Sequence, residues 1–335
     1  MTTLRLGTRG SQLALFQANA VAALLRARAG VSCDIGVIKT SGDRLAEAAL
    51  AEIGGKRLFV KEIEEALLAG SIDLAVHSSK DMPAQLPEGL AIGAALPRGD
   101  ARDAVVLPAG VGRGSRPHQA GRKGPPYDLE ELQRLVGEAP RIGTSSVRRA
   151  AQLARLFPGA RFEPIRGNLD TRLRKLDEGG YSALVLAAAG LERLAHRDRI
   201  SAVLPPEACV PAPGQGIIAV EVRDGDMTLR RTMDAISDAH AAAALTAERT
   251  VVMRLGGGCQ MPIGAYAAPA GDDLTLTAIV VSLDGTRVAR AQATGPATTA
   301  ERIGIDAAEG LFADGAADIL AEVERARGVV EGLQP

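Results

Sequence analysis

One cysteine stands in an unusual setting in the last third of the chain. The segment LGGGCQMPIG, residues 255–264, places Cys259 directly behind three glycines and just before a proline turn. Glycines carry no side chain and allow backbone angles that other residues avoid, and a reactive cysteine needs partly open surroundings. We therefore expect Cys259 at a loop tip that is open to a large group.

A run of polar residues, VHSSKDMP at positions 76–83, follows a predicted strand. In α/β folds such loops gather at the carboxyl ends of the strands, where ligands bind. As a plain surface pair, Lys80 and Asp81 would contribute only about 0–1 kcal/mol. We instead predict a catalytic role for Asp81, because a fixed carboxylate stabilises a cationic intermediate in a dry site. His77 is interpreted as a structural hydrogen-bonding residue.

Three further loops place arginines and hydroxyl groups at predicted helix starts: GTRGSQ at 7–12, GTSSVRR at 143–149 and RGNLDTR at 166–172. Helix N-termini attract anions, and guanidinium groups bind carboxylates or phosphates bidentately. If the segments face one another, they line one cleft for a small molecule with several carboxylates, with Arg9, Arg148, Arg149, Arg166 and Arg172 in its walls. Taken singly, each loop also fits a capped helix with surface arginines, with Ser11 as one such cap.

The segment GGKRLFVKE, residues 54–62, begins with two glycines and carries Lys56 and Phe59. It fits a mobile lid and, equally, an ordinary helix start. The sequence leaves both interpretations open.

Composition restricts the kind of protein. The 335 residues carry a net charge of −1, which indicates neither nucleic acid nor an anionic membrane as a bulk partner. The GxxxxGK[ST] phosphate loop is absent, and no His, Cys or Asp cluster has metal-ligand spacing, so we expect no metal. Three widely spaced cysteines and the lack of a signal or of a long apolar run predict a cytoplasmic protein.

Alternating strand and helix patterns predict βα units with a mainly parallel sheet in each half of the first two thirds. The first predicted helix begins after Ser11, with an apolar face formed by Leu13, Phe16, Ala20 and Leu24. The last third predicts helices on a small antiparallel sheet, with a hairpin turn at Asp284-Gly285.

These patterns predict three domains. Residues 1–107 and 217–235 form the first α/β domain, residues 128–216 the second, and residues 236–335 a smaller α+β domain. Residues 108–127 are rich in Gly, Pro and basic side chains, which indicates a surface loop or disordered insertion. Two crossings of the chain between the α/β domains would leave a cleft between them.

Seven spaced blocks together resemble one family. RLGTRGSQLALFQ, GGKRLFVKE, AVHSSKDMP, RDA at 102–104, IGTSSVRR, RGNLDTRL and GGGCQMPIG occur in the order found in porphobilinogen deaminases, also called hydroxymethylbilane synthases. The resemblance covers almost the whole chain, although the stretch 108–127 is longer and more basic than expected.

The resemblance implies a transferase that acts as a monomer in tetrapyrrole (haem, chlorophyll, cobalamin) biosynthesis. Such enzymes join four porphobilinogen molecules head to tail, release ammonia each time and yield hydroxymethylbilane. Their cofactor is a dipyrromethane held by a thioether to a loop cysteine, here Cys259. The family fold has two domains like periplasmic solute-binding proteins and a third that carries the cofactor.

The resemblance also implies roles for individual residues. Asp81 matches the catalytic carboxylate that stabilises the azafulvene cation left when ammonia departs, and Lys56 with Phe59 matches the lid. The cofactor- and substrate-binding blocks contain Arg9, Ser11, Gln17, Lys80, Thr144, Ser145, Ser146, Arg148, Arg149, Arg166 and Arg172.

Two rival interpretations belong to other classes. A solute-binding protein for a carboxylate ligand shares the two-lobed architecture, but it explains neither the third domain nor the LGGGCQ segment. A catalytically inactive relative that serves as a scaffold conflicts with the presence of both Asp81 and Cys259.

Overall fold

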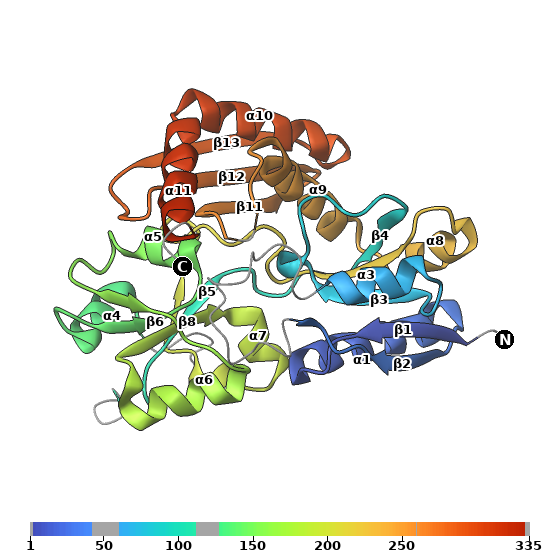
Figure 1. Cartoon of the computed structure of the whole chain (residues 1–335), viewed down its shortest axis with the longest axis horizontal. Coiled ribbons are helices and arrows are strands. Elements are labelled where there is room, and N and C mark those ends of the chain that lie inside the picture. Colours follow the sequence, from blue (N-terminus) through green and yellow to red (C-terminus); the bar gives the residue numbers. More distant parts are fainter. Residues whose placement is uncertain (1–2, 42–59, 112–126, 259, 332–335) are drawn as a thin grey trace.

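The computed structural model describes residues 3–41, 60–111, 127–258 and 260–331. Three parts are visible in Figure 1: a first lobe in blue and cyan, a second lobe in green, and a third domain in orange and red above them. Each part is built on its own sheet. The fold class predicted from the sequence, two α/β lobes and a C-terminal α+β domain, is confirmed.

The first lobe contains a five-stranded sheet with helices on both faces. Its strands lie in the spatial order β2 (Cys33–Val37), β1 (Leu4–Thr8), β3 (Leu74–Ser78), β10 (Ile218–Arg223) and β4 (Leu90–Ala95). The pairs β1–β2 and β1–β3 are parallel, whereas β10 runs antiparallel to both neighbours. The helices of this lobe are α1 (Gln12–Ala29), α3 (Lys61–Leu68) and α8 (Met227–Asp234).

The second lobe repeats this arrangement. Its strands lie in the order β7 (Arg161–Glu163), β6 (Arg141–Gly143), β8 (Ala183–Ala187), β5 (Asp103–Val106) and β9 (Ala202–Leu204), with β5 antiparallel to β8 and β9. Apolar side chains of α4 and α5 pack on one face of the sheet, and those of α6 and α7 on the other. These helices span Leu129–Val136, Val147–Leu153, Leu169–Lys175 and Ala188–Arg193.

Each lobe receives its antiparallel strand through a crossing from the other lobe. The first crossing, residues 96–102, runs from β4 to β5, and the second, residues 205–217, runs from β9 to β10. We expected residues 103–107 in the first domain, but β5 pairs within the second sheet, so that boundary is wrong. The sequence could not decide this because a short apolar strand fits either sheet equally well.

The two crossings lie against each other. The amide of Gly99 donates to the carbonyl oxygen of Gly216 at 3.0 Å. Gly216 has φ of +88°, and a Cβ atom on it would lie only 2.6 Å from the carbonyl oxygen of Gly99. A glycine is therefore required at position 216 for this close approach of the two crossings.

The buried face of α1 differs from the predicted one. Ser11 caps this helix, as expected, and accepts a hydrogen bond from the amide of Ala14 at 3.2 Å. Phe16 is exposed, however, and the buried side chains are those of Ala14, Gln17, Ala18, Val21 and Leu25. Because the helix is apolar on nearly all sides, its periodicity does not fix which face packs, and the smaller alanines lie against the sheet.

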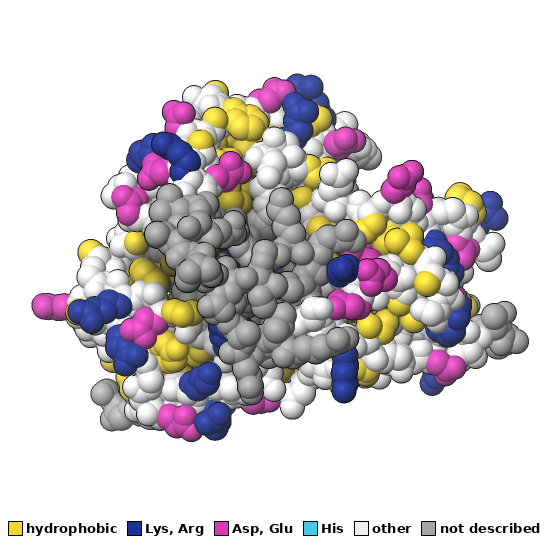
Figure 2. All heavy atoms as spheres, viewed as in Figure 1, with side chains coloured by type: hydrophobic (Ala, Val, Ile, Leu, Met, Phe, Trp, Pro, Cys, Tyr) yellow, Lys and Arg dark blue, Asp and Glu magenta, His cyan; other side chains and the backbone are white. Residues whose placement is uncertain are grey.

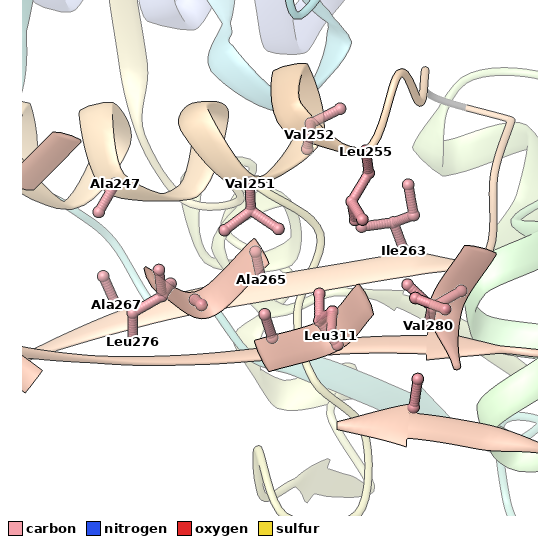
Figure 3. Close-up of a cluster of buried hydrophobic side chains, with 14 of the residues drawn as sticks. Ala247, Val251, Val252, Leu255, Ile263, Ala265, Ala267, Leu276, Val280 and Leu311 are labelled. Atoms are coloured by element: carbon pink, nitrogen blue, oxygen red, sulfur yellow. The ribbon is translucent and has the colours of Figure 1, made fainter. Parts of the chain in front are cut away.

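The third domain contains the antiparallel sheet β11 (Ile263–Ala270), β12 (Asp273–Val281) and β13 (Val288–Pro296). The hairpin between β12 and β13 turns at Asp284 and Gly285, as predicted. Helix α9 (Ala239–Arg254) lies over the sheet, and Figure 3 shows Val251 above Ala265 and the strands below it. Helices α10 (Ala300–Ala313) and α11 (Ala316–Glu331) complete this core.

One buried carboxylate ties the third domain to both crossings. Glu248 on α9 forms an ion pair with Arg98 of the first crossing. It also accepts hydrogen bonds from the amides of Gly214 in the second crossing, at 2.6 Å, and of Ala267 in β11, at 2.7 Å. The Arg98 guanidinium lies over the ring of Tyr266, 4.9 Å from its centroid. The third domain is thus anchored at the two crossings between the lobes.

Charged side chains of both signs are interspersed on the face shown in Figure 2, in keeping with the net charge of −1. In the part of the chain that the structure describes, no helix combines the length and apolar character needed to cross a bilayer.

The Glu248 anchor leads to a stability prediction. Glu248→Gln leaves the partly buried Arg98 charge without its counter-ion and removes a buried carboxylate that accepts two backbone hydrogen bonds, so we expect the free energy of unfolding to fall by about 3–5 kcal/mol. Urea unfolding followed by circular dichroism measures it. The control is Glu178→Gln, which removes the exposed partner of Arg174 and should change nothing measurable. Equal stability of wild type and Glu248→Gln would contradict the anchoring role.

Candidate active site

A cavity of about 330 Å³ lies where the two lobes and the third domain meet. Its walls come from the turn after β3, the start of α5, the second crossing, the end of α9 and the start of β11. The charged side chains in the described part of its lining are Lys80, Asp81, Arg148, Arg149, Arg172 and Arg249. Apolar side chains also contribute, namely those of Met82, Val252, Met261 and Ile263.

The turn that carries Asp81 is held from several sides. It follows β3 as a single turn of 3-10 helix, Ser79–Asp81, and the amide of Ser79 donates to the carbonyl oxygen of Ile217 at 3.0 Å. Gln17 on α1 is buried, and its amide nitrogen donates to the hydroxyl of Ser78 at 2.8 Å. These contacts fix the backbone of the turn, while the carboxylate of Asp81 itself is exposed to the cavity.

His77 lies just before this turn, within β3. Its Nε2 atom is 3.1 Å from Oε2 of Glu221 on β10, and both side chains are buried. The interpretation of His77 as a structural hydrogen-bonding residue is confirmed. Within the described residues, no group of three or more His, Cys, Asp or Glu side chains could hold a metal ion.

The two arginines of the GTSSVRR block are buried and share one counter-ion. Asp103, the first residue of β5, accepts from Arg148 Nη1 at 2.7 Å and from Arg149 Nη2 at 2.8 Å. Arg148 also donates to the carbonyl oxygen of Val210, and Arg149 to that of Val185. We expected these arginines either to bind carboxylates in a cleft or to lie on the surface of a capped helix. Both are buried, and Arg149 already donates within the protein from all three of its guanidinium nitrogens. Arg148 donates from Nη1, and its Nε atom is buried and has no hydrogen-bond partner.

The charge of Asp103 is secured by these arginines. Burial alone would raise the pKa of the Asp103 carboxyl, but the adjacent Arg148 and Arg149 outweigh it and hold that pKa well below its usual range. One carboxylate then neutralises one of two guanidinium charges, so the wall keeps a net positive charge. A buried surplus of positive charge favours an anionic ligand beside it.

Lys80 adds a further cation to the same wall. Its Nζ atom lies 3.4 Å from Oε1 of Gln215. Burial, and next the positive charge of Arg149, lower the pKa of Lys80 to about 8. A carboxylate bound here requires the ammonium form, so binding through Lys80 should be present below pH 8 and be lost as the pH rises above it.

The hydroxyl residues of the GTSSVRR block mainly shape their own loop. Ser146 caps α5 and accepts from the amide of Arg149 at 3.4 Å, while Thr144 accepts from the amide of Ser146 at 3.2 Å. Ser145 donates to the carbonyl oxygen of Ile165 at 2.8 Å. Ser145 and Ser146 still line the cavity, whereas Thr144 does not.

The remaining predicted binding residues divide into two groups. Arg172 on α6 lines the cavity, and its Nε atom donates to the carbonyl oxygen of Gly167 at 2.9 Å. Burial, with Arg149 second, lowers the pKa of Arg172. The lining does not include Arg9, Ser11, Gln17 or Arg166. Lys56, Phe59 and Cys259 lie outside the described residues.

Three residues of the site were not predicted as site residues from the sequence. Asp103 lies within the RDA block that contributed to the resemblance, but no role was predicted for its carboxylate. Gln215 lies in the segment PAPGQG, and Arg249 on α9 donates to the carbonyl oxygen of Ala84 at 2.7 Å. An acid directly after a basic residue, at the start of an apolar strand, is the only sequence signal that points to Asp103. Nothing in the helix pattern singles out Arg249.

Two lobes joined by two crossings, with a cation-rich cavity between them and a third domain, define a protein that holds a small molecule carrying several negative groups. Comparisons with known proteins make the class specific. The family described as "Porphobilinogen deaminase, dipyromethane cofactor binding domain" matches residues 4–231, and "Porphobilinogen deaminase, C-terminal domain" matches residues 242–313. The chain belongs to the porphobilinogen deaminase family, an enzyme family with a dipyrromethane cofactor.

Full-length relatives agree with this. The porphobilinogen deaminase of Geobacter metallireducens is 46% identical over 321 residues, which are 96% of this chain and 94% of that protein. The porphobilinogen deaminase of Moorella thermoacetica is 44% identical over 333 residues, 99% of this chain and 100% of that protein. The membership decides between enzyme and solute-binding protein in favour of the enzyme.

Solved structures that resemble the chain more remotely include "Ancestral Cationic Amino Acid Solute Binding Protein (AncCDT-1)". It is 16% identical, covers 70% of this chain and 88% of that chain, and gives a TM-score of 0.39. The effector binding domain of a BenM variant is 18% identical, covers 70% of this chain and 93% of that chain, and also gives 0.39.

The buried counter-ion leads to a prediction about acid stability. Because its pKa is lowered on folding, Asp103 stabilises the fold at pH values above its ordinary pKa, and this contribution is lost as the pH falls. Asp103→Asn should therefore lower the free energy of unfolding by about 3–5 kcal/mol at pH 7. The difference from wild type should shrink in urea unfolding at about pH 3.5.

The matched control is Asp100→Asn, which removes the more exposed partner of Arg102 three residues earlier. Its effect on stability should be much smaller at both pH values. A constant difference between wild type and Asp103→Asn across this pH range would contradict the assigned charge state of Asp103.

Proposed function

We propose that this chain joins four porphobilinogen molecules head to tail, releasing one ammonia at each step, and yields hydroxymethylbilane, with Asp81 as the catalytic carboxylate. One observation carries the proposal: Asp81 is the only acidic side chain in the described lining of a cavity that five cationic side chains share. The product is the linear precursor of tetrapyrroles.

The position of Asp81 suits this chemistry. When ammonia leaves the aminomethyl group of porphobilinogen, the pyrrole that remains is a cation, and a nearby carboxylate stabilises it. Asp81 is exposed to the cavity on a turn whose backbone is held by Ile217 and by the Gln17–Ser78 pair. A carboxylate held by a rigid turn needs little reorganisation when the charge develops.

The cationic side chains suit the acetate and propionate groups of pyrroles. Lys80, Arg148, Arg149 and Arg172 all line the cavity, and Arg148 Nε is a buried donor that still lacks an acceptor. A dipyrromethane, with four carboxylates, fits walls of this charge. The bound group supplies the pyrrole carbon to which each new unit is joined, and the side chains named here bind and orient its carboxylates.

The other predicted binding residues are proposed to act at the edge of the cavity or through the loops they hold. Arg9 follows β1, which is parallel to β3, so its loop and the Asp81 turn lie at the same edge of the first sheet. Arg166 follows β7, which is parallel to β6, and so lies at the same edge as the GTSSVRR loop. Gln17, Ser11, Thr144, Ser145 and Ser146 hold these loops through the hydrogen bonds already described.

We propose Cys259 as the attachment point of the dipyrromethane. It lies outside the described residues, but its sequence neighbours Gly258 and Met261 line the cavity. The other two cysteines are poorly suited. Burial raises the pKa of the Cys209 thiol to about 12, and burial also raises the pKa of Cys33, which begins an edge strand of the first sheet.

Lys56 and Phe59 are proposed to form a lid, on the basis of the sequence alone. We also propose that the enzyme acts as a monomer in the cytoplasm. The family resemblance supports the monomer, and the free thiols of Cys33 and Cys209 suit a reducing compartment. Sedimentation analysis at micromolar concentration tests the monomer.

The proposed role of Asp81 leads to a prediction about turnover. Asp81→Asn should lower kcat by at least about 100-fold, because the neutral amide no longer stabilises the cation. The folded structure should be unchanged, since the Asp81 side chain is exposed. Glu88→Gln, at an exposed acid on the same lobe, is the control and should leave kcat unchanged. Wild-type turnover in Asp81→Asn would remove it from the mechanism.

The proposed role of Cys259 leads to a prediction about the attachment of the dipyrromethane. The intact mass of the purified protein should exceed that of the polypeptide by one dipyrromethane, and Cys259→Ser should lose this excess. Cys33→Ser should keep it, because Cys33 is not the proposed attachment point. An excess mass that persists in Cys259→Ser would place the thioether elsewhere.

A further inference from the structure

Gln215 occupies a central place in the cavity wall that the mechanism above does not use. It lies in the second crossing and is almost completely buried, with 1% of its surface exposed. Its Nε2 atom donates to the carbonyl oxygen of Ala101 at 2.6 Å and to Oδ1 of Asp103 at 2.9 Å. Its Oε1 atom accepts from Lys80 Nζ and from Arg149 Nη2, each at 3.4 Å.

These contacts leave one orientation for the amide. Ala101 offers a carbonyl oxygen and Asp103 a carboxylate, and both can only accept hydrogen bonds, so the NH2 end of Gln215 must face them. The amide oxygen must then face the two cations. A flipped amide would place its single oxygen against these two acceptors and its NH2 group against the two cations.

The oxygen therefore marks a point shared by cations from different lobes. Lys80 follows β3 of the first lobe, and Arg149 belongs to α5 of the second. Because each nitrogen lies 3.4 Å from the same oxygen, the two cannot be farther apart than twice that distance. Two like charges this close repel each other, and Arg149 is the second cause, after burial, of the lowered pKa of Lys80.

We propose that Gln215 is a positioning residue that holds Lys80 and Arg149 around one point, so that a cation from each lobe binds the same carboxylate group of the pyrrole chain. The inference rests on the proposed function, in which these two cations bind carboxylates. The neutral amide oxygen offsets the repulsion between Lys80 and Arg149 only in part. A carboxylate bound between the two cations would neutralise it more fully. The amide keeps the pair assembled before that carboxylate arrives, which lowers the cost of binding it.

The test is Gln215→Met in the holoenzyme, which keeps the length of the side chain and removes both polar ends. We expect KM for porphobilinogen to rise by about tenfold, the loss typical of a hydrogen bond to a charged group. The value of kcat should change by less than about twofold, because Asp81 is untouched. The fraction of chains that carry the dipyrromethane, read from the intact mass, should also fall.

The pH dependence of kcat/KM distinguishes this positioning role from a simple loss of stability, which would leave the pH profile unchanged. The oxygen of Gln215 favours the charged form of Lys80, so its removal lowers the pKa of Lys80 further below about 8. The alkaline limb of kcat/KM, which reports groups of the free enzyme, should therefore move to lower pH.

Gln152→Met is the matched control. Gln152 is also buried, and its amide makes two hydrogen bonds with the backbone of Val210, at 3.0 and 2.7 Å, and none with Lys80 or Arg149. It should lose stability to a similar extent while KM and the alkaline limb stay at their wild-type values. If Gln215→Met does not fold, Gln215→Asn withdraws the oxygen by one methylene, and the same rise in KM is expected.

A second variant separates this inference from the proposed function. Lys80→Met should raise KM whether or not Gln215 matters. If Lys80→Met raises KM but the Gln215 variants keep the wild-type KM and alkaline limb, the positioning role is wrong and the proposed function stands. If Lys80→Met also leaves KM unchanged, the binding of carboxylates by this wall is itself refuted.

Discussion

Two guanidinium groups in a protein interior need a counter-ion, and Asp103 supplies it for Arg148 and Arg149. This carboxylate is the first residue of β5, the strand that the first crossing delivers into the second sheet. The chain path between the lobes thus places the negative charge under α5, and α5 turns its arginines toward the cavity. Gln215 then extends the same network from Asp103 to Lys80 in the first lobe. The residues that set the charge of the site therefore lie on, or next to, the segments that connect the lobes.

A second buried carboxylate does similar work for the third domain. Glu248 pairs with Arg98 of one crossing and accepts from Gly214 of the other, so α9 is attached where both crossings pass. The end of α9 and the segment around Gly258 and Met261 line the cavity, and the Glu248 contacts hold α9 in place beside it. Breaking either buried pair costs several kcal/mol, so any opening of the lobes that preserves Asp103 and Glu248 must bend the crossings around these points.

Much of this could be predicted from the sequence because the signals are local. The Ser11 cap, the Asp284-Gly285 turn and the polar run after β3 depend on a few adjacent residues. The errors concern features that the local sequence pattern does not determine. The strand of residues 103–106 fits either sheet, and α1 is apolar on nearly all sides, so only tertiary packing selects their partners. The burial of the two arginines was missed for the same reason, since their counter-ion lies 45 and 46 residues away from them in the sequence.

The central claim is that the cavity between the three parts holds a carboxylate-rich group close to Asp81. A crystal structure of the purified holoenzyme tests it most directly. We expect density for two linked pyrrole rings, continuous with the side chain at position 259, with their ring nitrogens facing Asp81. Their carboxylates should lie against Lys80, Arg148, Arg149 or Arg172. Density for this group elsewhere on the molecule, or a cavity that holds only water in protein whose mass includes the cofactor, would contradict it.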